Sequence, residues 1–87
     1  MKLLVSVLEA RVADRVADAL VAGGFGVTRV DTVGGFLRRG NGTLLVGVEN
    51  ESVDSALALM RAAYAHGAGA ATGGPVFVLD AGLCRRL

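Results

Sequence analysis

The stretch KLLVSVLEARVADRVADALVAGG, residues 2–24, decides the fold because it sets a strand directly before a helix. Lys2–Leu8 has apolar side chains at both odd and even positions, which predicts a strand covered on both faces. From Ala10 onward, apolar positions recur every three to four residues with Arg and Asp between them, which predicts an amphipathic helix. Gly23 and Gly24 predict the end of this helix, because glycine readily adopts the left-handed conformation that stops one.

The rest of the chain continues the alternation of strands and helices. The further predicted elements are a strand over Phe25–Val33, a strand over Thr43–Glu49, a helix capped by Asn50 or Ser52, a connector over Ala65–Pro75 and a strand over Val76–Leu79. This βαββαβ order predicts one α+β domain over residues 1–87, a ferredoxin-like fold with a four-stranded antiparallel sheet.

The predicted sheet has more apolar surface than two helices can cover. Both helices of a βαββαβ unit lie on one face, yet the strands are apolar on both faces. The 87-residue chain is 53% hydrophobic with a mean hydropathy of +0.56, which is high for a soluble monomer of this size. We therefore expect copies of the chain to cover the second face in a homo-oligomer, with a different protein partner as the open alternative.

Several classes of function fit the composition poorly. No apolar run approaches the roughly 20 residues of a transmembrane helix, and the apolar N-terminal run meets Glu9 without a cleavage site, so neither a membrane protein nor a signal peptide is predicted. A net charge of +1 argues against a nucleic-acid polymer as partner. The single Cys84 suits the reducing cytoplasm, and one His with one Cys predicts no metal site. No pair of side chains resembles a catalytic dyad, so we expect a protein that is not an enzyme.

The loop GGFLRRGNG, residues 34–42, is the most unusual segment of the chain. Its glycines would let backbone N–H groups approach an anion, Phe36 offers a face for stacking on a base, and Arg38 and Arg39 can reach phosphates. An ordinary β-hairpin explains the same residues, with Asn41 and Gly42 making the turn and Phe36 packing on the sheet. Spacing alone leaves the two interpretations open.

Three residues outside this loop are weaker candidates. Thr28 is most simply a strand-forming residue, and Phe77 is most simply part of the core. Gly47 is more informative, because a glycine inside a strand often marks the close approach of a ligand or of another backbone.

The run VGGFLRRGNGTLLVGV, beginning at Val33, resembles the TGGFLxxGNTTxLxGV signature of the PII-like cyclic di-AMP receptor proteins of bacteria. The opening MKLLVSVLEA, the segment ADALVAGGFGVT and the terminal GGPVFVL resemble the same family in order and spacing. The similarity covers about residues 1–64 and the last strand.

This resemblance implies a PII-like homotrimer of ferredoxin-like subunits, which would bind one cyclic di-AMP in each inter-subunit cleft and signal to a downstream protein without catalysis. No cofactor is implied apart from this ligand. The residues that match ligand contacts of the family are Thr28, Gly35, Phe36, Leu37, Asn41, Gly47 and Phe77.

The chain departs from the family pattern at the rim of the implied pocket. Gly24 and Gly26 stand where the family usually has a polar residue and an Arg, and the connector over Ala65–Pro75 is shorter than usual. Arg86 stands near the position of a family Gln that contacts the ligand, so we count it as a candidate contact. These departures keep an alternative open, in which the trimer binds a different nucleotide or has lost the ligand and acts as a protein-interaction module.

Overall fold

The computed structural model describes residues 1–32, 41–68 and 75–82 and forms one four-stranded sheet with two helices. The elements are β1 (Lys2–Glu9), α1 (Ala10–Ala22), β2 (Val27–Thr32), β3 (Asn41–Val48), the 3₁₀ turn η1 (Asn50–Ser52), α2 (Val53–Ala68) and β4 (Val76–Asp80). The strand order is β2-β3-β1-β4, and every neighbouring pair is antiparallel. This is the ferredoxin-like topology that the βαββαβ order predicts.

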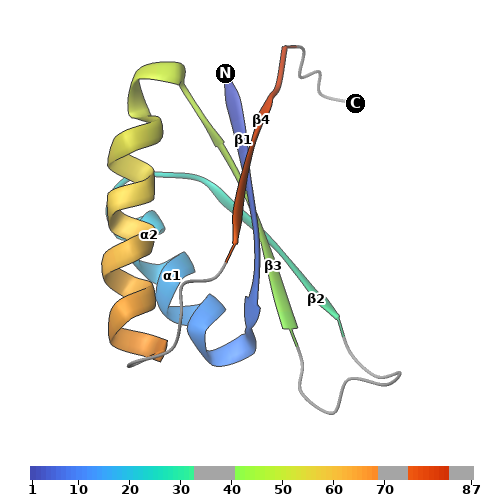
Figure 1. Cartoon of the computed structure of the whole chain (residues 1–87), viewed down its shortest axis with the longest axis vertical. Helices are drawn as coiled ribbons and strands as arrows, with labels where there is room; N and C mark the ends of the chain where they lie inside the picture. The colour runs from blue at the N-terminus through green and yellow to red at the C-terminus, as the bar shows by residue number, and fades with distance from the viewer. Residues whose placement is uncertain (33–40, 69–74, 83–87) are drawn as a thin grey trace.

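Both helices lie on the same side of the sheet (Figure 1). The even-numbered residues of β1 and β3 point toward them, and Leu4, Leu44 and Val46 are fully buried there. From α1, Val16 and Leu20 complete this layer, and from α2, Ala56 and Met60 do so. The core therefore lies between the helices and one face of the sheet.

The end of α1 forms as its glycines predict. Gly24 has a φ of +90°, the left-handed region that favours glycine. The N–H of Phe25 donates to the carbonyl of Leu20, and the N–H of Gly24 donates to the carbonyl of Val21, which together make a Schellman motif. Because Phe25 is engaged in this motif, β2 starts at Val27, two residues later than predicted.

One prediction about α2 is wrong. The helix continues to Ala68, so the connector does not begin at Ala65. The 3₁₀ turn η1 occupies Asn50–Ser52, and α2 starts at Val53, so Ser52 is the residue directly before α2. The N–H of Ser52 donates to the carbonyl of Glu49, which shows that a backbone turn opens this segment.

The second face of the sheet carries apolar side chains that neither α1 nor α2 covers (Figure 1), and we call it the open face. Its apolar members are Leu3, Val5, Val7, Val30, Leu45, Phe77 and Leu79. Four of them are at least 44% exposed. The prediction that two helices leave one apolar face uncovered is confirmed.

Candidate ligand-binding site

The open face brings two of the predicted site residues into one row across the sheet. Thr28 of β2 pairs with Leu45 of β3, Leu45 pairs with Val5 of β1, and Val5 pairs with Phe77 of β4. Directly paired residues share a face, so all four side chains project from the open face. Thr28 and Phe77 lie at opposite edges of the sheet, about 14 Å apart, or three interstrand spacings of about 4.8 Å.

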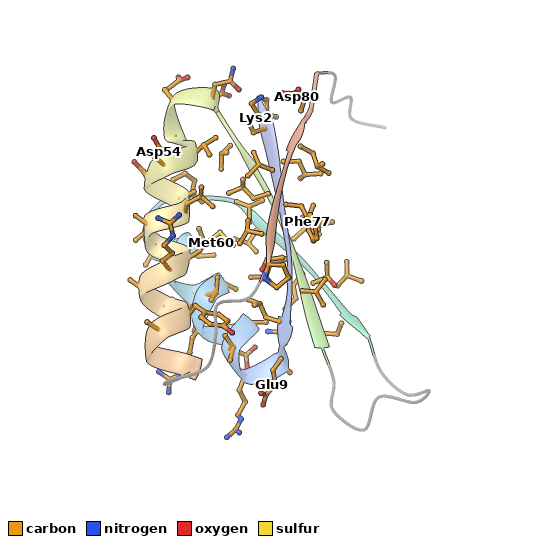
Figure 2. All side chains as sticks on the ribbon, viewed as in Figure 1. Lys2, Glu9, Asp54, Met60, Phe77 and Asp80 are labelled. Carbon is orange, nitrogen blue, oxygen red and sulfur yellow. The ribbon has the colours of Figure 1, made fainter. Side chains whose placement is uncertain are left out.

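Phe77 is not a core residue. Its side chain is 56% exposed and points away from the helices (Figure 2). The interpretation of Phe77 as simple core, taken from the sequence pattern alone, is therefore wrong. The reason is the register of β4, which pairs Phe77 with Val5 of the open face and Val78 with Leu4 of the core face.

Gly47 also lies on the open face, diagonal to Thr28. Among the described residues, a methyl group at this position would meet only the Met1 Sδ atom, at 3.9 Å, which is ordinary van der Waals contact. Packing within this part of the chain therefore does not require glycine at position 47. Gly26 directly precedes Val27, which pairs with Val46, and no described atom lies within 4 Å of a methyl group at Gly26 either. This end of the β2–β3 pair thus offers exposed backbone beside the Thr28 hydroxyl.

Gly42, on the other face of the same strand, is constrained by its surroundings. A methyl group there would lie 2.7 Å from the Ala13 Cβ atom and 3.2 Å from the Arg29 Nε atom. The glycine lets α1 approach β3 closely. Asn41 and Gly42 are paired with Thr32 and Asp31 in the β2–β3 ladder, so they belong to β3.

Asn41 lies far from the other predicted residues on β3. It pairs with Thr32 and with Glu9 at the end of the sheet opposite Gly47, and six residues of strand separate the two by about 20 Å. Gly35, Phe36, Leu37 and Arg86 lie outside the described residues. The site as predicted from the sequence is therefore brought together only in part, at Thr28 and Gly47.

Arg29 fixes β2 against α1 on the core face. Its Nε donates to Asp31 at 2.6 Å, a second nitrogen donates to Asp14 of α1, and its Nη2 donates to the carbonyl of Ala10 at 3.4 Å. The hydrogen bonds to Asp31 and Asp14 raise the pKa of Arg29, which keeps the guanidinium charged. This cluster orients the strand that carries Thr28, and sequence reasoning missed it because the contact between Arg29 and Asp14 depends on how α1 packs.

Met1 is a further residue that sequence reasoning missed. Its Sδ atom is the nearest atom to the open position at Gly47, and its side chain is 47% exposed. No local sequence pattern could predict that Met1 lies beside Gly47, because this contact depends on the pairing of Leu3 with Gly47.

The described ranges offer groups that can contact a ligand. No group of three or more His, Cys, Asp or Glu side chains gathers there to hold a metal ion. The open face offers apolar side chains, the threonines Thr28 and Thr43 and exposed strand backbone, which suit the flat apolar surface of a base. None of the helices described is long and apolar enough to cross a membrane.

These features define a small ferredoxin-like binding domain. The chain matches the family model of the cyclic-di-AMP receptor over residues 1–69, and it belongs to this family. The match includes β1 to β3 and all of α2.

A solved structure extends the likeness to nearly the whole chain. A protein of unknown function from Pediococcus pentosaceus ATCC 25745 superimposes with a TM-score of 0.75 at 25% sequence identity, over 99% of this chain and 96% of that one. The two chains therefore share this fold over nearly all of the residues compared.

Proposed function

We propose that this protein is a non-enzymatic receptor that binds cyclic di-AMP between the subunits of a homotrimer and passes the signal to a downstream protein. Membership of the cyclic-di-AMP receptor family carries the ligand and the signalling role. The finer claim, a site between subunits, is supported by the separation of Thr28 and Phe77 at opposite edges of the open face.

Neighbouring copies would complete such a site. A single ligand in van der Waals contact with both Thr28 and Phe77 of one chain has to cross the apolar middle of the open face. When copies pack their open faces together, β2 of one chain and β4 of another can instead approach each other at the rim. The exposed positions at Gly47 and Gly26 then become the places where a ligand reaches strand backbone without a steric clash.

The remaining site residues of the proposal come from the resemblance. Gly35, Phe36, Leu37 and Asn41 would form the wall that holds one adenine, with Phe36 stacking on the base, and Arg86 would contact a phosphate or base. We expect no metal or cofactor to be needed. The single cysteine and the signalling ligand fit a cytoplasmic protein.

Calorimetric titration with cyclic di-AMP tests this function. We expect saturable heat with one ligand per subunit, and a loss of affinity of at least tenfold in Phe36→Ala, since stacking on a base contributes about 1–3 kcal/mol. Gly47→Ala is the matched structural variant, because the described residues leave room for its methyl group, which a ligand lying against the strand backbone would meet. Absence of heat at saturating ligand overturns the ligand assignment, and unchanged affinity in both variants overturns the site.

One observation favours the alternative of a different nucleotide or of a pure interaction module. Gly24 and Gly26 supply no side chain where the family pattern has polar groups, and Gly26 lies next to the exposed strand backbone at Gly47. A thermal-shift screen of adenine and guanine nucleotides, cyclic and linear, separates these cases. A shift only with another nucleotide identifies a changed ligand, and no shift with any nucleotide identifies an interaction module.

A further inference from the structure

A groove lies on the helix side of the sheet, between α2 and the edge strand β4, and we call it the α2–β4 groove. Leu57, Met60, Arg61 and Tyr64 line it from α2, and Val76 and Val78 line it from β4. Ser6 and Leu8 of β1 form its floor. Its volume is about 510 Å³, within the range of small-molecule sites.

The groove exists because α2 packs mainly on α1 and leaves β4 uncovered. The register shows this most directly at Val78. Val78 pairs with Leu4, which is fully buried on the core face, yet Val78 itself is 45% exposed. In Figure 2, Met60 lies between α2 and the sheet, at the inner wall of this gap. The α2–β4 groove is therefore an apolar part of the core face that α2 does not cover.

The polar groups of the groove favour an anion. Ser6 on the floor is fully buried and donates its hydroxyl to the Pro75 carbonyl at 2.8 Å, so its hydrogen bond is already made. Arg61 lies at the rim and makes no ion pair within residues 1–32, 41–68 and 75–82. The positions three and four residues away on α2 are Leu57, Ala58, Tyr64 and Ala65, none of which is acidic. Within the described ranges, the Arg61 guanidinium thus lies beside the apolar groove without an ion-pair partner.

We propose that the α2–β4 groove binds an apolar carboxylate, a medium-chain fatty acid or a molecule of similar shape, with its tail against Leu57, Met60 and Val78 and its carboxylate at Arg61. Val78 and Phe77 project from opposite faces of β4, so this site is separate from the open face. The inference does not depend on cyclic di-AMP binding.

The two methionines of the chain allow a direct test, because they lie on different sides of the sheet. Met60 lines the groove, and Met1 lies beside Gly47 of the open face. With ¹³C-methyl-methionine label and decanoate as the probe, below its micelle concentration, we expect the Met60 signal to shift saturably while the Met1 signal stays in place. A shift at Met1 alone or at both sites, or no saturable shift at Met60, overturns the proposal.

Two pairs of variants give the chemistry of the site. Val78→Phe fills the groove and should weaken decanoate binding at least tenfold, whereas Leu79→Phe, one residue along on the open face, should leave it unchanged. Arg61→Met should weaken decanoate binding about two- to fivefold, the range for an exposed ion pair, and leave the weaker binding of decanol unaltered. Arg61→Lys keeps the positive charge and should retain most of the parent's affinity for decanoate. The proposed site is refuted if Val78→Phe and Leu79→Phe change decanoate affinity equally. It is also refuted if Arg61→Met binds decanoate as tightly as the parent does.

Discussion

The two faces of the sheet are formed by the same four strands, but one is buried and the other is exposed. On the core face, Leu4, Leu44 and Val46 are fully buried beneath α1 and α2. On the open face, Phe77 and Leu79 are about half exposed although they are just as apolar. The comparison teaches that this chain encodes more apolar surface than its own helices can bury. We attribute the excess to association with other copies and to ligand binding.

The largest expected effect is on assembly. Leu79→Lys places a charge on the apolar open face, and burying that charge between copies would be costly. We expect the mass measured by light scattering to fall from that of a trimer to that of a monomer. Val21→Lys is the matched control, since Val21 is 62% exposed on α1, away from the sheet. If both variants keep the mass of the parent, the open face is not the interface.

The next effect concerns two adjacent leucines of β3. Leu44→Ala removes a fully buried side chain of the core face, and we expect it to lower the free energy of unfolding by about 2–5 kcal/mol. Leu45→Ala removes a side chain of the open face. If copies associate through this face, folding is linked to association, and the loss in free energy of unfolding should depend on protein concentration. Urea unfolding at two protein concentrations measures both. A cost for Leu45→Ala that equals that of Leu44→Ala at every concentration would contradict the contrast between the faces.

A pair of glycines on β3 sharpens the comparison further. Gly42→Ala should lower the free energy of unfolding by about 1–3 kcal/mol, because its methyl group would overlap Ala13 of α1. Gly47→Ala meets no close atom and should be neutral, or stabilising by up to about 1 kcal/mol. Thermal melts of the two variants give the difference. Comparable losses would mean that Gly47 is already enclosed by a neighbouring copy.

The smallest effect is at the edge of the sheet, where Lys2 and Asp80 form an ion pair across β1 and β4 (Figure 2). The hydrogen bond from Lys2 lowers the pKa of Asp80. Because the pKa of Asp80 is lower in the folded state, the ion pair stabilises the fold at pH values above the ordinary carboxyl pKa. This stabilisation is lost as the pH falls through the lowered pKa of Asp80.

Melting temperatures of the parent and Asp80→Asn across the acid range check this sign. We expect a small difference at neutral pH that vanishes in strong acid. Asp18→Asn is the control, because Asp18 of α1 makes no ion pair within the described segments. A difference that grows as the pH falls would contradict the linkage.

Sequence patterns predicted the elements well wherever the signal was local. The apolar period of α1 and the glycine pair at its end gave a helix with its stop in the right place, because both depend on residues within a few turns. The end of α2 was predicted too early, because Gly67 favours the end of a helix whereas Ala65 and Ala68 have the highest helix propensity, and the helix continues to Ala68. For the candidate site, the sequence motif beginning at Val33 indicated the family and the ligand loop. The separation of Thr28 and Phe77 could be known only once the strand order was known.

The sequence by itself determined the βαββαβ order, the excess of apolar surface and the family resemblance, because these follow from periodicity, composition and a contiguous motif. Only the tertiary structure decided which face each strand residue joins. The register of β4 placed Phe77 on the open face and Val78 at the α2–β4 groove, and a shift of one residue would exchange them. The packing of α1 brought Asp14 to Arg29 and left β4 uncovered by α2. These pairings join residues far apart in the chain, so no local pattern encodes them.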